Sequence, residues 1–193
     1  MKYVNLLILL IIFVVSCNRP EDGGNTDRSI QASRLLNEAV ALARSGQSDQ
    51  ALTTIDKALA LDPDWIALYY NQAIVYSVKG LKDKEENSYN EVIRRAGKAS
   101  RGDKARYLSA AYYNLAFIDA DRSQPGRAFA NLEKALKLAA DVNIYYHDLV
   151  SNQALAALRS DRRFVALMRQ YWPGFSRQTG RFPIGSSANN PDK

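Results

Sequence analysis

The feature that most constrains the fold of this chain is an internal repeat. A pattern of Asn, then Ala, then Gly occurs twice with an offset of 34 residues, at Asn37, Ala39 and Gly46 and at Asn71, Ala73 and Gly80. The pentapeptide YYNQA at 69–73 returns as YYNLA at 112–116, an offset of 43. Three copies of one supersecondary unit are therefore expected, each burying its apolar face against a neighbour.

Within each copy the apolar residues follow helical spacing, which predicts pairs of helices and an all-α fold. Gly46 and Gly80 stand where a helix must stop, because Gly adopts a left-handed turn without steric cost. In the third copy Ser123 takes this place, and residues 123–126 are expected to turn by a different route. Asp62 followed by Pro63 predicts a helix start. Seven alanines recur where small side chains let helix axes approach closely: Ala39, Ala51, Ala58, Ala73, Ala116, Ala128 and Ala135.

These copies resemble the tetratricopeptide repeat (TPR), a helix–turn–helix unit of 34 residues. The resemblance implies a right-handed solenoid of three repeats with capping helices at its C-terminal end. Several positions depart from the family pattern: Glu85 replaces a small residue, Asp119 a large apolar one and Ser123 the usual Gly. The second copy also lacks the closing Pro. Asp119 is expected in a polar network or facing a groove. The helical domain is expected over residues 30–170, with repeats at about 32–65, 66–99 and 109–142 and closing helices at 143–170.

The TPR resemblance also implies a binding groove, lined by the first helix of each pair. Three asparagines would form a ladder there, and their amides could donate to and accept from an extended peptide. Tyrosines would add contact area at modest entropy cost. The alternative is that Asn simply caps internal contacts at this position. The matching positions are Asn37, Val40, Tyr70, Asn71, Ile74, Tyr113, Asn114, Phe117, Tyr146 and His147.

The N-terminal residues read as a targeting segment. Residues 4–15 are apolar except for Asn5, and as a helix they would span about 18 Å. A bilayer core of about 30 Å is too thick for them, whereas the apolar region of a secretory signal has this length. A flexible tether rich in Pro, Gly, Asn and Asp follows, and the helical domain begins after it.

The end of the apolar run, Val14-Val15-Ser16-Cys17, resembles the lipobox of bacterial lipoproteins. The resemblance implies that residues 1–16 are removed, that Cys17 is lipidated, and that residues 17–29 form the tether. It further implies a lipid-anchored protein of the cell envelope. Asn18, in place of the Asp that often retains lipoproteins in the inner membrane, favours the outer membrane facing the periplasm. The alternative is an ordinary signal peptide that contains a Cys.

The chain has a formal net charge of +6, and its cations cluster. The bland interpretation is a solvated helix surface, and the functional one is docking on a partner or on anionic headgroups. Export makes nucleic acid an unexpected partner. Residues 97–104 read as a loop or an extension of the flanking helices. The middle cluster contains Arg94, Arg95, Lys98, Arg101 and Lys104, and the late one contains Arg159, Arg162, Arg163, Arg169, Arg177 and Arg181.

Several chemistries have no support in the sequence. One Cys and one His cannot build a disulfide framework or a standard zinc site, and no phosphate loop or nucleophile elbow occurs. No enzyme, cofactor, metal or small-molecule substrate is expected. The prediction is a non-enzymatic adaptor or assembly factor that binds a protein or peptide. The alternative is a structural subunit of an envelope complex that docks through its convex or basic surface or on anionic lipid. In the Pro/Gly/Ser tail at 171–193, four apolar residues are expected to pack on the last helix or in a groove: Trp172, Phe175, Phe182 and Ile184.

Overall fold

The computed structural model describes residues 26–173 and 175, and this part of the chain is all-helical, without strands. The predicted all-α class is therefore confirmed. The signal segment, Cys17, most of the tether, Phe182 and Ile184 lie outside the described residues. The chain divides into two compact units, unit 1 (Met1–Ala99) and unit 2 (Ser100–Lys193), and the boundary falls at the end of the second predicted copy.

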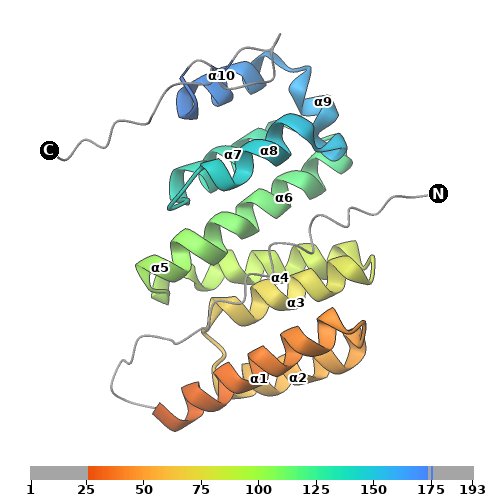
Figure 1. Ribbon diagram of the computed structural model, residues 1–193, viewed down its shortest axis with the longest axis vertical. Coiled ribbons are helices and arrows are strands. Elements are labelled where there is room, and N and C mark those ends of the chain that lie inside the picture. Colours follow the sequence, from red (N-terminus) through yellow and green to blue (C-terminus); the bar gives the residue numbers. More distant parts are fainter. Residues whose placement is uncertain (1–25, 174, 176–193) are drawn as a thin grey trace, which may run out of the picture. The chain divides into compact units, whose positions relative to one another are not determined.

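Unit 1 consists of two helical hairpins (Figure 1). Helix α1 packs on α2 and α3 packs on α4, while α3 also contacts both α1 and α2. A short 3-10 turn, Ala96–Lys98, follows α4. The bounds of the four helices are α1 Thr26–Arg44, α2 Ser48–Leu61, α3 Ile66–Val78 and α4 Lys82–Arg95.

Unit 2 begins with a continuous helical segment, because residues 101–108 lead through a π-helical turn directly into α6. Residues 101–104 thus extend the helix that follows, whereas residues 97–98 belong to the 3-10 turn and residues 99–100 lie outside any helix. Helix α6 packs on α7, and α10 packs on α7 and α9. The helices are α5 Arg101–Asp103, α6 Ser109–Asp121, α7 Pro125–Leu138, α8 Asn143–Ser151, α9 Ala156–Arg159 and α10 Arg162–Tyr171.

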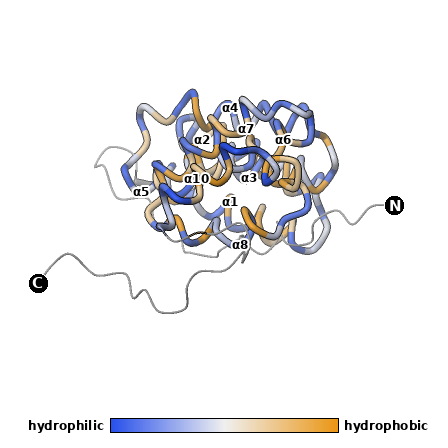
Figure 2. Tube along the Cα trace, turned by 90° about the horizontal axis from the view of Figure 1, so that it is seen from above, coloured by the Kyte–Doolittle hydropathy of each residue, from blue (hydrophilic) through white to orange (hydrophobic). Residues whose placement is uncertain are grey.

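The repeated alanines lie in the interior of both units. All seven are buried, with exposed fractions of 0 or 1%. Apolar and polar stretches alternate along the helices in Figure 2, the pattern of helices that bury one face. The burial of these seven positions is consistent with the small-residue contacts predicted from the repeat.

The turns inside the three hairpins share one geometry. Gly46 and Gly80 have φ angles of 81° and 70°. Ser123 has a φ of 59°, so the prediction that the third hairpin turns by a different route is wrong. The backbone hydrogen bonds explain this: Leu81 N donates to Tyr76 O, and Gln124 N donates to Asp119 O at the equivalent place. The helix-ending pattern thus imposes the left-handed conformation even without Gly.

The start of α3 differs from the prediction. Asp62 follows the end of α2, and its N–H donates to Ala58 O at 2.9 Å, so it does not cap α3. Helix α3 begins at Ile66, after Trp65. The carbonyl of Pro63 instead accepts the hydroxyl of Tyr69 at 3.0 Å, because the buried Trp65 and Ile66 place the connection against α3.

The beginning of the tail packs against the helices of unit 2. Trp172 is 2% exposed, and its Nε1 donates to Asn143 Oδ1 at 2.9 Å. The Phe175 ring lies 6.0 Å from that of Phe164, in an edge-on arrangement. These two tail residues therefore extend the core of unit 2, which is one of the two arrangements expected for them.

Candidate functional site

The asparagines of the predicted ladder make the same local contact in both units. Asn71 Nδ2 donates to Ala67 O at 2.8 Å, and Asn114 Nδ2 donates to Ala110 O at 3.0 Å. Both side chains are half-buried, whereas Asn37 on α1 is exposed. Each contact uses one of the two amide hydrogens. The second hydrogen and the carbonyl oxygen retain the capacity for an outside partner.

The two tyrosines at the position before these asparagines lie in different surroundings. Tyr70 is half-buried, with its ring 5.9 Å from that of Tyr89. Tyr113 is only 4% exposed. Its ring stacks on Tyr145 at 4.2 Å and meets Phe117 edge-on at 5.0 Å. Tyr113 therefore belongs to the core of unit 2 and offers little surface to a ligand, contrary to the expectation for a groove residue.

The remaining predicted groove residues vary equally in exposure. In unit 1, Val40 is half-buried on α1 and Ile74 is buried on α3. In unit 2, Tyr146 is half-buried with its ring 5.2 Å from that of Trp172. His147 is exposed on α8, and its Nδ1 lies 3.9 Å from Asp148 Oδ1. Within unit 1, the helices α1 and α3 that carry these predicted residues contact each other.

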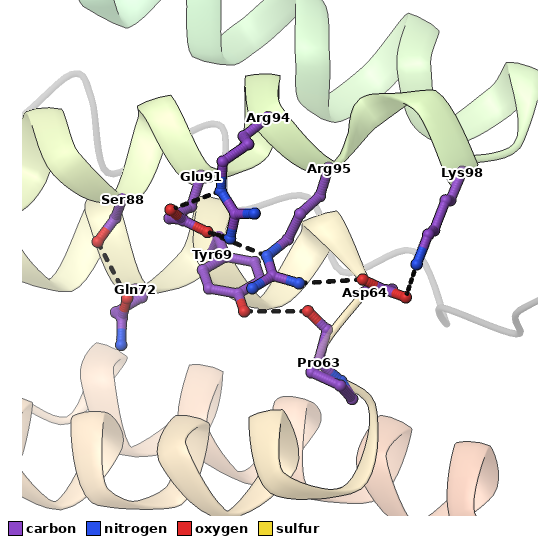
Figure 3. Close-up of polar contacts among 9 residues, drawn as sticks. All are labelled: Pro63, Asp64, Tyr69, Gln72, Ser88, Glu91, Arg94, Arg95 and Lys98. Carbon is purple, nitrogen blue, oxygen red and sulfur yellow. Dashed lines mark hydrogen bonds and ion pairs between the residues drawn. The ribbon is translucent and has the colours of Figure 1, made fainter.

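A chain of side-chain hydrogen bonds connects three helices of unit 1. Gln72 on α3 donates from Nε2 to Asp56 Oδ1 on α2 at 3.2 Å. Its Oε1 accepts the hydroxyl of Ser88 on α4 at 3.0 Å, as Figure 3 shows. The amide thus has one donor and one acceptor committed in opposite directions, which fixes its orientation and the registration of the three helices.

The predicted basic cluster at the end of α4 is an ion-pair network (Figure 3). Arg95 Nη1 lies 3.0 Å from Asp64 Oδ1, and its Nε lies 3.0 Å from Glu91 Oε2. Lys98 Nζ reaches the other oxygen of Asp64 at 2.6 Å. Arg94 Nε donates to Glu91 Oε1 at 3.0 Å. Three of the five cations singled out in the sequence, Arg94, Arg95 and Lys98, are therefore paired with carboxylates.

The network also contacts an aromatic ring of α3, and it shifts the pKa values of its two acids. The guanidinium of Arg95 lies over the Tyr69 ring, 4.7 Å from its centroid. The hydrogen bond from Lys98 lowers the pKa of Asp64, and the one from Arg94 lowers the pKa of Glu91. These shifts show that the acids are better stabilised as anions in the fold.

Sequence reasoning missed both acids of this network, although two signals were present. Glu91 precedes Arg94 and Arg95 by three and four residues, which places all three on one helix face. Asp64 and Lys98 are 34 residues apart, one repeat offset, so stacked copies bring them together. The other two predicted basic residues belong to unit 2, where Arg101 is exposed and Lys104 is half-buried.

Asp119, which breaks the repeat pattern, lies in a polar network. It is 1% exposed, and its Oδ2 accepts from Asn131 Nδ2 at 2.8 Å. Arg127 Nε lies 3.2 Å from its Oδ1. Of the two sequence expectations for this residue, the polar network is the one observed. Its role is to join α6 to α7.

Unit 1 buries polar groups near α4 at some cost. Tyr89 is fully buried, and its hydroxyl has no hydrogen-bond partner among the residues that the structure describes. Burial raises the pKa of Tyr89 well above its ordinary value. Burial also raises the pKa of Glu85, although a hydrogen bond from Ser77 acts in the opposite direction. Both positions are therefore candidates for substitutions that improve stability.

No family model matches this chain, and no curated protein is found to be similar to it. In the described ranges no group of three or more His, Cys, Asp or Glu could hold a metal ion. The described helices are also too short or too polar for any of them to cross a bilayer.

Proposed function

We propose that this chain is a TPR-type, lipid-anchored protein of the bacterial envelope that binds a protein or peptide as an adaptor or assembly factor. The observation that carries the proposal is the matching state of Asn71 and Asn114. Each is half-buried on the first helix of its hairpin, and each is fixed by a hydrogen bond to the carbonyl four residues earlier. An amide held this way presents its remaining donor and its acceptor in a defined direction.

A peptide backbone offers alternating N–H and C=O groups, so it complements amides of this kind. Asn37 supplies a third, exposed amide on α1, which contacts α3. The half-buried Val40 and Tyr70 provide apolar and aromatic area beside these amides in unit 1. The repeat spacing and the buried alanines support the TPR assignment, since they are the positions at which that repeat needs small residues.

The groove proposal is tested by capture of envelope proteins with the full chain. One variant replaces Asn37, Asn71 and Asn114 with Ala. The control variant replaces Asn87 and Asn90, two exposed asparagines on α4, with Ala. A partner held by the native chain and by the control, but lost from the triple variant, is the expected result. A partner retained by all three proteins would overturn peptide recognition by these amides.

The alternative, a fixed subunit that docks through the α4 cluster, has less support. Arg94, Arg95 and Lys98 are engaged with Glu91 and Asp64. A partner would have to displace these acids before it could use the cations. Charge reversal at the three cations is therefore expected to disturb unit 1 itself, with altered thermal unfolding, in addition to any effect on binding.

The proposed anchor has its own test. Cys17→Ser removes the thiol that would carry the lipid. Metabolic labelling with palmitate followed by membrane fractionation should give a labelled, membrane-bound native chain and an unlabelled variant. A native chain that remains unlabelled after export would contradict lipidation and favour an ordinary signal peptide.

A further inference from the structure

The two units differ in charge. Residues 26–99 contain ten Lys or Arg and ten Asp or Glu, whereas residues 100–175 contain eleven and seven. The second helices of the hairpins in unit 1, α2 and α4, together carry five basic and six acidic residues. In unit 2, α7 and α10 carry six basic residues and one acid, Glu133. The excess positive charge of the described chain therefore lies in unit 2.

Helices α7 and α10 are neighbours in unit 2. The guanidinium of Arg163 on α10 lies over the ring of Phe129 on α7, 4.6 Å from its centroid. The apolar side of α10 is already used, because Phe164, Leu167 and Met168 are buried in the core. What these helices present to solvent is thus their polar side.

Three of the exposed residues of each helix form a stripe that carries two cations. On α7, Ala130, Lys134 and Lys137 are exposed, and on α10, Arg162, Ala166 and Arg169 are exposed. In both helices the spacing is i, i+4 and i+7, which places the three side chains on one face. We call these six positions the basic face.

One acid, Glu133, is exposed on α7 directly before Lys134, and two other acids of unit 2 are committed elsewhere. Asp161 caps the start of α10 by accepting from Arg163 N, and it also pairs with the Arg163 side chain at 2.6 Å. Asp119 is buried and accepts from Asn131. Lys137 and Arg169 enter none of the ion pairs formed among the described residues. Glu133 offsets part of the charge, and the four cations of this face still leave it net positive.

We propose that the basic face docks electrostatically on the anionic headgroups of a phospholipid bilayer. A protein partner would be expected to find aromatic or large apolar anchors, and lysine is depleted from the centres of protein interfaces. The large apolar side chains exposed in the described ranges are Ile30, Val78, Leu81 and Ile144, and none belongs to α7 or α10. Anionic headgroups need no such anchor, and basic residues near a membrane surface add to binding individually.

This proposal does not rest on the asparagine groove, so either can fail alone. The experiment uses the full chain with Cys17→Ser and one new cysteine, at Ala166 or Ala130 on the basic face, or at the exposed Ala60 on α2 as control. Each cysteine carries an environment-sensitive fluorophore. Vesicles contain neutral phosphatidylcholine alone or with about 30% phosphatidylglycerol, which supplies the negative surface potential.

The expected result is a blue-shifted emission at 166 and 130 with the anionic vesicles only, and no shift at 60. Reversal of Lys134, Lys137, Arg162 and Arg169 to Glu should lower the vesicle partition coefficient at least about tenfold. The matched reversal of Arg34, Lys57, Lys82 and Lys84 in unit 1 changes the net charge equally and should alter it less than about threefold.

Three outcomes would overturn the proposal. The first is an equal shift at all labelled positions, and the second is an equal loss of partition in both charge-reversed variants. The third is a response to a soluble acidic polypeptide without a response to anionic vesicles, which would indicate a protein partner. Circular dichroism of each variant establishes beforehand that the helices are intact.

Discussion

The hairpins α3–α4 of unit 1 and α6–α7 of unit 2 carry the same repeat 43 residues apart, yet they are stabilised differently. The first hairpin is held on its outside, by the network around Asp64 and Glu91 and by the hydrogen bonds of Gln72. The second is held from within, by the buried Asp119 and the aromatic stack on Tyr113. A repeat therefore sets the backbone and the small-residue contacts, while other positions are free to change their role.

The largest expected effect is at the tyrosine position that recurs in both hairpins, Tyr70 in unit 1 and Tyr113 in unit 2. Tyr113→Ala should lower the free energy of unfolding by about 3–5 kcal/mol, because it empties a buried site. Tyr70→Ala removes a half-buried ring and should cost about 1–2 kcal/mol. Urea unfolding followed by circular dichroism measures both. Equal losses would mean that the difference in burial between the hairpins is not real.

The buried acid of unit 2 comes next. Asp119→Ala leaves the amide of Asn131 without its acceptor and should cost about 2–3 kcal/mol. The nearby control Asp121→Ala, at an exposed position, should stay within about 0.5 kcal/mol of the native chain. Hydrogen exchange resolved by helix should show the loss of protection in α6 and α7. A mild effect of Asp119→Ala would show that the network contributes little.

Removal of the buried Tyr89 hydroxyl, which has no hydrogen-bond partner among the described residues, should stabilise the fold. Tyr89→Phe is expected to raise the free energy of unfolding by about 1 kcal/mol, since it deletes an unsatisfied group from unit 1. Tyr145→Phe in unit 2 should lower it by about the same amount, because that hydroxyl lies 2.8 Å from Ser109 Oγ. Opposite signs are expected in the same denaturation assay, and matching signs would contradict the hydrogen-bond assignment.

The shared left-handed turns predict another pair of opposite effects. Ser123→Gly should stabilise unit 2 by up to about 1 kcal/mol, because a side chain at positive φ is strained. Gly80→Ala should destabilise unit 1 by about 1 kcal/mol for the same reason. Space is no obstacle at Gly80, where an added Cβ meets no atom within 4 Å. Thermal unfolding of the two variants measures how much a side chain at positive φ costs in stability.

The smallest effects are expected in the pH dependence. Hydrogen bonds from Arg163 lower the pKa of Asp161 to about 2, so its stabilising contribution is complete above its unfolded pKa and is lost as the pH falls towards 2. Burial raises the pKa of Glu85, so its ionisation opposes folding and protonation relieves this as the pH falls.

Substitutions at Asp161 and Glu85 should therefore reduce the pH dependence of the free energy of unfolding in different pH ranges. Asp161→Asn should remove part of the acid-induced loss below about pH 4. Glu85→Gln should raise stability at neutral pH and remove the gain on mild acidification. Urea titrations across this range provide the measurement. A Glu85→Gln variant that is less stable at neutral pH would show that the ionised carboxylate stabilises unit 1, contrary to this prediction.

Much of the fold could be predicted because its signals are local. Helical spacing, the repeated alanines and Gly80 define helices and turns from neighbouring residues alone. The turn at Ser123 does not follow from residue preference, because backbone hydrogen bonds impose its conformation. The start of α3 does not follow from Asp62 either, because the N–H of that residue donates to Ala58 O at the end of α2.

The candidate site was harder to predict, since exposure depends on what the next helix supplies. Tyr113 is buried because Tyr145 of α8 stacks on it. The sequence of the third copy alone does not predict this contact. The local sequence around α4 is rich in cations, whereas Asp64, which pairs with Arg95, is distant in sequence. The ion pair therefore becomes visible only in the fold. The asparagines were identified correctly as a recurring position, but their helical hydrogen bonds become visible only in the structure.

The hydrogen bonds of Gln72 have a consequence for engineering. Repeat proteins invite modular construction, in which one unit is copied and spliced to lengthen an array. The hairpin at 66–95 is not self-sufficient in this respect, because Gln72 donates to Asp56 of the preceding hairpin. A designer who duplicates it must also reproduce an acceptor at the position of Asp56, or redesign Gln72 as an apolar residue. The smallest module that can be spliced without such a correction therefore includes both hairpins.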